Sequence, residues 1–540
     1  MKNRTGLISL TVALLTLTAL AGTALPAPSA QGQAVIAMWG LPTRIIGSVE
    51  AVGGYVFAMI HDVLAVTDPA GQTQGRLAER WERSADGKTW TLHLRDAKFQ
   101  DGQPVTAEDV KFSYEFYLHP RYPVAGAPLL EIEGARAFKE GKATQVSGIQ
   151  VVGPRTVRFI LTRRFAFFLD QITAPPYYIM PKHALAGADM ARIVEHPYNR
   201  RPIGAGPFRL TDWRERESIT FTAFPGYWGG RPNLERIVLR LVPEPATVMA
   251  DLRAGNLDAG QILPDEFEAF QRERNLQTLR MPGDVSFWFS FNHRHPFTSD
   301  VRVRRAFYHA VDREAMVRVL QKGYGRVVNS PIHPSLWQHN AQIKGPTYDP
   351  ERARALLREA GFAPGPGGAL QRDGRPFRAR YTFLSEKRYQ DQALMIQQFF
   401  RQVGIELALE PLERGDFFGR FWQVRNSDNV EMVGLAWFNL LSPVQTEFEF
   451  NFKSTATTPR IVQYQNREID ALLDQAATAT DRGALRAIYF RAQEVVLQDV
   501  PRVMTFRPDE LWAVKRTLVL PKVNSLAEFF RSTPRWQVNR

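Results

Sequence analysis

The chain has 540 residues, no cysteine and a formal net charge of +13, with 68 Lys and Arg against 55 Asp and Glu. The absence of cysteine excludes disulfides, thiolate metal sites and cysteine nucleophiles. Apolar residues make up 44% of the chain, which is enough for cores in the about three to four domain-sized units that this length suggests. Basic and acidic residues are interleaved throughout, so the charge indicates a solvated basic surface rather than a nucleic-acid-binding face.

The first thirty residues are predicted to be a secretory signal peptide. Two basic residues open it, an apolar run from Leu7 to Ala21 follows, and small residues and proline come next. The alternative, a membrane anchor, is disfavoured because the run falls short of the roughly 20 residues that span a bilayer. The chain has no cysteine to carry a lipid, so we expect a mature protein without a membrane span, free in a periplasm-like space. Three positions are possible for cleavage: after Ala21, Ala24 or Ala30.

The next segments predict a strand at residues 34–39 (AVIAMW) and a helix at residues 56–66 (VFAMIHDVLAV). A clearer pattern follows. Trp90, Leu92 and Leu94 alternate with polar residues, which is the period of a half-buried strand, and Asp-Gly turn pairs stand on both sides of it. Thr106 stands three residues before Asp109, a weak capping box that predicts the start of a helix.

The segments LAERW (77–81) and DGKTWTLHLRDAKFQDGQPVTAEDVKFSY (86–114) resemble the extracytoplasmic solute-binding proteins of peptide and nickel ABC importers, the family 5 solute-binding proteins. The resemblance implies an α/β, two-lobed periplasmic-binding-protein-like fold (type II, cluster C-like) with an extra subdomain in the first lobe. It implies capture of a small solute, a peptide or peptide-like compound, and delivery to ABC permease subunits. It also implies a periplasmic monomer that is not an enzyme and needs no cofactor.

The same resemblance gives the expected domain boundaries. Lobe I is expected to be discontinuous, the subdomain to be inserted into it, and lobe II to follow as one continuous segment. The expected ranges are 33–54, 196–288 and 500–540 for lobe I, 55–195 for the subdomain and 289–499 for lobe II.

Later segments predict further elements. Residues 285–297 (VSFWFSFNHRHPF) alternate as a strand and are expected to cross between the lobes. Asp312 is predicted to separate two helices, and Asp349-Pro350 to open another that Gly361 ends. Residues 469–503 predict two amphipathic helices.

No catalytic constellation is present in the sequence. It contains no GxSxG elbow and no HExxH helix. Gly204 and Gly206 form a GxG, but Pro207 lacks the free amide that a phosphate cradle needs. The pair His293 and His295 lacks a suitably spaced carboxylate, so a loop is favoured over a metal site. A secreted hydrolase and a chaperone-like scaffold stay as alternative functions.

The resemblance places several residues around a ligand cleft between the lobes. It implies a ligand-facing aromatic in the loop after the first strand and another in residues 285–297. For each candidate, a purely structural role is an equal alternative. The candidates are Tyr55, Phe287, Trp288, Asn292, Arg414, Trp437, Phe438, Asn439 and Leu440.

One departure from the family concerns the ligand. Peptide-binding members carry an Asp three residues after a Trp, and this Asp pairs with the ligand's ammonium group. Here Trp437 matches the Trp, but Leu440 stands where the Asp is expected, beside the uncharged Asn439. Charge-assisted hydrogen bonds contribute about 1.5–3 kcal/mol each, so we expect no free dipeptide to be held by an acid at this position. A modified peptide, a sugar-like compound or a metal chelate is therefore an alternative, and Glu413, Asp416 and Glu447 are possible compensating acids.

Overall fold

The computed structural model describes residues 32–46, 51–68, 72–122, 127–173, 177–421, 430–438, 444–456 and 462–539. The predicted signal peptide lies outside these ranges. Within them, no helix combines the length and the apolar character that a bilayer crossing requires.

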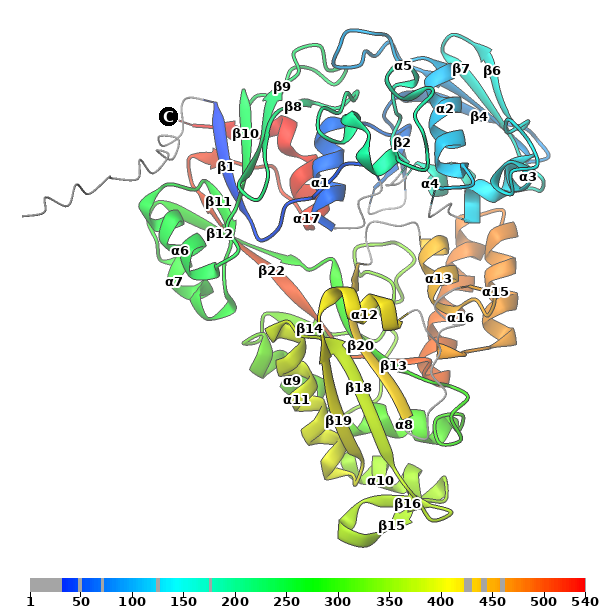
Figure 1. The fold of residues 1–540 in the computed structure, drawn as a ribbon, viewed down its shortest axis with the longest axis vertical. Coiled ribbons are helices and arrows are strands. Elements are labelled where there is room, and N and C mark those ends of the chain that lie inside the picture. Colours follow the sequence, from blue (N-terminus) through cyan, green and yellow to red (C-terminus); the bar gives the residue numbers. More distant parts are fainter. Residues whose placement is uncertain are drawn as a thin grey trace, which may run out of the picture.

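A mixed sheet forms the centre of the first lobe (Figure 1). Strand β1 (Gln33–Met38) runs parallel to β10 and β11, and the other pairs are antiparallel. The remaining strands are β8 (Phe208–Arg214), β9 (Ser218–Ala223), β10 (Arg236–Leu241), β11 (Ala259–Gln261), β12 (Leu276–Pro282) and β22 (Phe506–Lys515), with β14 (Gly325–Val327) added at β22. A short pair, β23 (Leu518–Val519) and β24 (Gln537–Val538), lies near the C-terminus.

Helices cover both faces of this sheet because its strands are apolar on both sides. Ala34, Ile36 and Met38 of β1 pack with α1 (Ala51–Ile60) and α17 (Leu526–Arg531). Val35 and Ala37 point to the opposite face and pack with α6 (Pro245–Ala254) and α7 (Phe267–Gln271). The period-2 alternation of the strand therefore feeds two separate cores.

The subdomain contains the sheet order β4-β5-β7-β6. Strand β5 alternates as predicted, with Trp90, Leu92 and Leu94 buried. The predicted capping box is present, since the Thr106 main-chain N–H donates to the Asp109 carboxylate at 2.9 Å. The elements are β2 (Ala65–Thr67), β3 (Thr73–Gly75), β4 (Ala78–Arg83), β5 (Thr89–Leu94), β6 (Ile149–Gly153), β7 (Thr156–Ile160), α2 (Ala107–Leu118), α3 (Ala135–Lys139), α4 (Phe168–Ile172) and α5 (Lys182–Leu185).

The second lobe contains the sheet order β19-β18-β20-β13-β21. Its strands are β13 (Val285–Phe291), β18 (Arg378–Leu384), β19 (Glu406–Leu412), β20 (Val430–Phe438) and β21 (Arg502–Met504), and β15 (Ala363–Pro364), β16 (Leu370–Arg372) and β17 (Arg375–Pro376) form a small separate sheet. Its helices are α8 (Val301–Ala310), α9 (Arg313–Leu320), α10 (Pro350–Glu359), α11 (Lys387–Gln402), α12 (Arg414–Phe421), α13 (Val444–Phe452), α15 (Arg467–Thr478) and α16 (Arg482–Asp499).

The helix starts predicted in this lobe are confirmed. The Asp312 carboxylate accepts from the Ala315 main-chain N–H at 2.7 Å, and the Asp349 carboxylate accepts from that of Arg352 at 2.8 Å. Gly361 takes φ +88° directly after the end of α10. The two helices predicted within residues 469–503 are α15 and α16.

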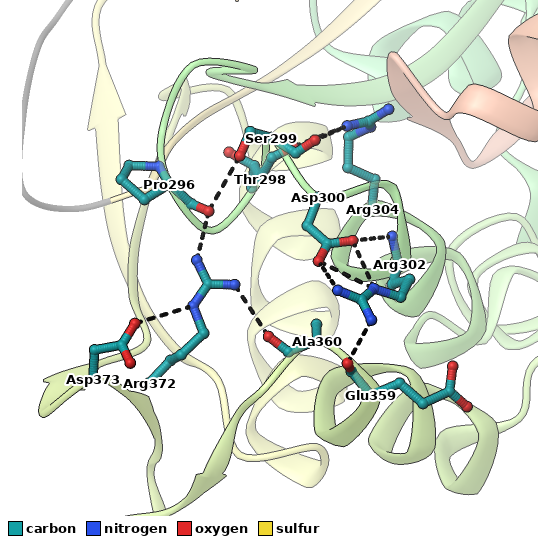
Figure 2. Close-up of polar contacts among 10 residues, drawn as sticks. All are labelled: Pro296, Thr298, Ser299, Asp300, Arg302, Arg304, Glu359, Ala360, Arg372 and Asp373. Atoms are coloured by element: carbon teal, nitrogen blue, oxygen red, sulfur yellow. Dashed lines mark hydrogen bonds and ion pairs between the residues drawn. The ribbon is translucent and has the colours of Figure 1, made fainter.

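Three arginines hold the turn that leads from β13 into α8 (Figure 2). Arg372 and Arg304 donate to main-chain carbonyl oxygens of the turn, and Arg302 is paired with Asp300 and with a carbonyl at the end of α10. One guanidinium group can donate hydrogen bonds to several carbonyl oxygens at once, so some of the chain's arginines stabilise this turn.

The two lobes are joined where β12 passes into β13 and where β21 passes into β22. The two crossings touch, since the Gly283 N–H donates to the Pro508 carbonyl at 3.1 Å and the Thr505 N–H to the Phe287 carbonyl at 2.9 Å. A Cβ at Gly283 would lie 2.3 Å from the Pro508 oxygen, so this close approach requires glycine. The residue ranges expected from the sequence for the two lobes and the subdomain stay a prediction.

One expectation about the N-terminal region needs correction. The helix expected at residues 56–66 is α1, which begins at Ala51 and ends at Ile60, and the residues after it lead into β2. At the helix end the Ile60 carbonyl accepts from the Gly206 N–H at 2.8 Å, and beyond it Asp62 binds the Arg76 guanidinium at 2.9 Å. The GxG serves this same place, since a Cβ at Gly204 would lie 2.0 Å from the Ile60 carbonyl oxygen.

Candidate functional site

The candidate site is the junction between the lobes, at the carboxyl ends of the parallel strands β1 and β11. In open α/β sheets, ligands bind outside the carboxyl ends of the strands. In Figure 1 the carboxyl end of β1 points toward the second lobe. Two large apolar side chains are exposed at this edge, Trp39 directly after β1 (49% exposed) and Leu263 shortly after β11 (41% exposed).

Tyr55 lies in α1 and connects lobe I to the first crossing. Its ring stacks on Phe530 of α17 with centroids 4.9 Å apart, and its hydroxyl donates to Asp284 Oδ2 at 3.1 Å. Burial and the nearby Asp284 charge raise the pKa of the Tyr55 hydroxyl well above its usual value. The residue is 4% exposed, so in this structure the side chain contacts protein rather than open cleft.

Phe287 and Trp288 lie on opposite faces of β13, and both faces are covered. Phe287 stacks on Phe506 at 4.9 Å, and the Arg502 guanidinium lies 4.2 Å from the centre of the Trp288 ring. The sequence left open which face is turned inward, and the structure buries both. Asn292 closes the following turn, because its Oδ1 accepts from the Arg294 main-chain N–H at 2.9 Å.

The remaining candidates lie in lobe II. Arg414 is exposed at the start of α12 and forms an ion pair with Glu386. Trp437 and Phe438 end β20, where their backbones pair with Ser286 and Val285 of β13. Their side chains, and residues 439–440 altogether, lie outside the described part of the chain. The ladder nevertheless brings the predicted ligand segment to the start of β13, directly beside the first crossing.

Two of the possible compensating acids are exposed on lobe II. Glu413 accepts a hydrogen bond from the Ser385 hydroxyl at 2.7 Å, and Asp416 lies in the first turn of α12. The side chain of Glu447 is outside the described part.

The sequence analysis missed an acidic group at the junction itself. Asp284, at the first crossing, is 1% exposed, and its Oδ1 has no partner among the described residues. Burial raises the pKa of Asp284 to about 6, although the Tyr55 hydrogen bond and the Arg507 charge oppose the shift. Burial, assisted by the Asp284 charge, raises the pKa of Glu510 on β22 to about 7. Part of the signal was available, since the two adjacent acids Asp509 and Glu510 directly precede the apolar run at residues 511–514 of β22.

Two basic groups lie beside these acids. Burial lowers the pKa of Arg507 to about 9, and the Asp284 charge opposes this shift. His333 binds the Gly283 carbonyl at 3.1 Å through Nε2, and burial next to Arg507 lowers the pKa of His333 to about 2. The histidine is therefore neutral and serves as a fixed part of the first crossing.

The subdomain also touches lobe II, at the rim opposite the crossings. The Arg163 guanidinium donates to the Ala477 carbonyl of α15 at 2.6 Å, and Arg482 of α16 lies 3.8 Å from Asp170 of α4. We call these two pairs the rim contact. The lobes therefore meet both at the crossings and at the rim.

Two other places are less suited to a solute. An outer hollow near Arg200 and Trp213 has charges that are mostly paired locally, such as Arg200 with Glu215 and Asp101 with His183. The His293 and His295 rings bind main-chain atoms of their own loop and of Pro501. Among the described residues, no group of three or more His, Asp or Glu side chains could hold a metal ion.

The two lobes with open sheets, joined by two touching crossings, define a two-lobed solute-binding protein. The sequence profile of the bacterial extracellular solute-binding proteins, family 5 (middle part), matches residues 72–459. The chain belongs to this family, whose members are binding proteins that act outside the cytoplasm.

Similar proteins agree with this assignment. The dipeptide-binding protein of Escherichia coli (strain K12) is 28% identical over 78% of this chain and 78% of its own. The oligopeptide-binding protein AppA from Bacillus subtilis, solved with a nonapeptide, superposes with a TM-score of 0.79 at 24% identity, covering 95% of this chain and 100% of its own. NikZ from Campylobacter jejuni, solved with Ni(L-His), gives 0.79 at 22% identity, covering 94% and 100%. These structures confirm the two-lobed fold.

Proposed function

We propose that this protein captures a peptide or peptide-like solute in the periplasm and delivers it to the permease of an ABC importer, without chemically changing it. The observation that carries the proposal is the pair of touching crossings beside the carboxyl ends of β1 and β11, in a member of a solute-binding family. The dipeptide- and oligopeptide-binding relatives favour a peptide over other solutes.

Lobe closure is the mechanism that we propose. The backbone at Pro282–Val285 and at Thr505 would absorb the rotation, and the rim contact would form and break. A solute held by both lobes binds the closed form more tightly and therefore shifts the population toward it. The permease is proposed to recognise this closed form of a monomer.

The proposed ligand surroundings are the candidates from the sequence. Tyr55, Phe287 and Trp288 are covered by protein here, so we propose that they lie behind the surface that the solute contacts in the closed form. Arg414 and the segment 437–440 are expected to border it from lobe II. Leu440 carries no charge, so we propose that this chain does not use the ammonium anchor that peptide-binding members have at this position.

The test is a thermal-shift screen of the mature chain against di- to nonapeptides, followed by mass spectrometry of the recovered peptide. We expect a peptide at about a hundred times its Kd to stabilise the protein by ~2.7 kcal/mol and to be recovered intact. No stabilisation by any peptide would contradict the proposed function, and cleavage of the peptide would contradict the proposal that it is not an enzyme.

A further inference from the structure

We propose that the Glu510 carboxylate provides the counter-charge for a cationic group of the solute, such as the ammonium of a free-amine peptide. This inference rests on the proposed function. It assigns the charge recognition to lobe I and to the second crossing strand, rather than to the segment after Trp437.

The position of Glu510 suits this role. The antiparallel register pairs Gln261, the last residue of β11, with Trp512 of β22. Glu510 therefore lies two residues past the end of β11, at the edge where the carboxyl ends of the parallel strands meet the junction. Its side chain is only partly buried, in contrast to Leu511 and Trp512, which follow it.

The charge of Glu510 has no direct partner among the described residues. Its side-chain hydrogen-bond donors in that part of the chain are both neutral: the amide of Gln261, at 2.9 Å, and the indole of Trp512, which lowers the pKa of Glu510. Asp509, which points to the other face of the strand, takes Arg280 at 2.6 Å and Arg326 at 3.6 Å. Arg388 of α11 faces Glu510 from lobe II, but its guanidinium is bound to Glu386 at 2.7 Å.

The two acids nearest Glu510, Asp284 and Asp509, add to its negative charge, and Arg388 offsets part of it. Asp284 at the first crossing repels it, and Tyr55 of α1 cannot neutralise either acid. Arg507 and Arg531 lower the pKa of Asp284 and so offset part of the charge at the first crossing. The Asp284 Oδ1 atom is buried without a hydrogen-bond partner among the described residues, which is an independent sign that the cluster can accept a further donor, such as an ammonium N–H. A ligand cation would complete it.

The exposed rim of the site also suits a cation with an apolar side chain. Trp39 and Leu263 stand at the same strand edge and are about half exposed. An indole face attracts an ammonium group, and both side chains offer apolar surface to the rest of a peptide. These two residues are the ones that we expect to lie next to a solute held at Glu510.

The acidity of Glu510 makes the proposal measurable. A pKa of about 7 leaves this carboxyl about half protonated at neutral pH, while a bound ammonium favours the ionised form. Binding should therefore release about half a proton at pH 7, and affinity should rise as pH increases from 6 to 8. The neighbouring titratable and charged groups that modify this window are Asp284, Asp509, Tyr55, Arg388 and Arg507.

The experiment is calorimetry with the most strongly stabilising free-amine peptide of the screen and with its N-acetylated form, in two buffers of different ionisation enthalpy. The proteins are wild type, Glu510→Gln and a control, Glu268→Gln, which changes an exposed acid on α7. We expect Glu510→Gln to weaken the free-amine peptide by about ten- to hundredfold and to abolish proton release. The control should match wild type.

The N-acetylated peptide keeps the test interpretable. Unchanged binding of this form by Glu510→Gln shows that the variant is folded, so its loss of free-amine binding is specific and supports the inference. Equal binding of the free-amine peptide by wild type and Glu510→Gln overturns the inference while leaving peptide capture intact. Failure of wild type to bind any peptide overturns the proposed function instead, and the inference with it.

Discussion

Two buried aspartates, one in the subdomain and one at the lobe junction, have opposite surroundings. Asp109 is 5% exposed, and its carboxylate accepts from the main-chain N–H groups of Thr106 and Lys182, both at 2.9 Å, and from the Thr106 hydroxyl at 2.7 Å. Asp284 is 1% exposed and accepts from the Tyr55 hydroxyl at Oδ2, and the Ala527 backbone also lowers the pKa of its carboxyl, while Oδ1 has no hydrogen-bond partner among the described residues. The first carboxylate is fully used by the fold.

The number of hydrogen-bond donors at each carboxylate distinguishes a rigid region, the subdomain, from the lobe junction, where a ligand or a proton can bind. A buried carboxylate with several donors fixes the elements around it, whereas one with too few donors carries an unrecovered desolvation cost. In the subdomain Asp109 joins the start of α2 to α5. At the junction, the desolvation cost of the Asp284 carboxylate falls where the lobes meet. A cationic ligand or a proton that binds there can lower this cost.

The largest expected effect is at the satisfied aspartate. Asp109→Ala leaves the main-chain N–H groups of Thr106 and Lys182 without their acceptor and removes the Asp109 half of the capping box of α2, so we expect a loss of about 3 kcal/mol in the free energy of unfolding. The control Glu79→Ala, an exposed position on β4, should stay within about 0.5 kcal/mol. Urea denaturation followed by tryptophan fluorescence measures both. Equal losses in the two variants would break the comparison.

The second prediction concerns the unsatisfied aspartate and pH. The folded-state pKa of Asp284, about 6, lies above its ordinary value of 3.8. A raised carboxyl pKa stabilises the fold below pH 4, and this contribution is lost as the pH rises through 6. Wild type should therefore lose about 2–3 kcal/mol relative to Asp284→Asn between pH 4 and pH 7. Urea denaturation of both proteins across this range is the measurement, and parallel stability curves would show that Asp284 is not perturbed.

The third prediction moves the acid to the position that the family uses. Leu440→Asp, introduced into the Glu510→Gln protein, should restore about tenfold in affinity for the free-amine peptide, because it supplies a carboxylate from lobe II. The N-acetylated peptide should gain nothing. Calorimetry compares the double variant with Glu510→Gln alone, and no gain would mean that the segment after Trp437 does not approach the ligand's amine.

The smallest expected effect is at the rim contact. Replacing Arg163 and Arg482 together by alanine removes one hydrogen bond and one partly exposed ion pair that hold the subdomain on lobe II. The closed form should become less populated, and the apparent peptide affinity should fall by about two- to fivefold. Arg192→Ala, which breaks a pair confined to the subdomain surface, serves as the control. An unchanged affinity in the double variant would exclude the rim contact from closure.

Local features were predictable from the sequence, and the reason is visible in particular residues. The helix starts at Thr106, Asp312 and Asp349 depend on side chains within three residues of the amides they bind. Strand β5 was predictable because its alternation is local. The two-lobed fold followed from the resemblance of residues 77–114, and the family match and solved structures confirm it.

The junction could not be predicted because its parts are distant in the sequence. Asp284 and Glu510 come together only through the pairing of β12 with β22. Helix α1 includes two glycines, which have low helix propensity, so the sequence did not predict its first turn. Packing against the sheet and α17 stabilises the helix there. The sequence could not show whether Phe287 or Trp288 faces inward, because both faces of β13 are buried.

The account depends most on lobe closure around a peptide, and small-angle X-ray scattering tests it most directly. With a peptide that calorimetry shows to be bound, we expect the radius of gyration to decrease and the scattering curve to approach the one calculated from this structure, in which the crossings and the rim contact are both formed. An unchanged curve at saturating bound peptide would contradict capture by closure.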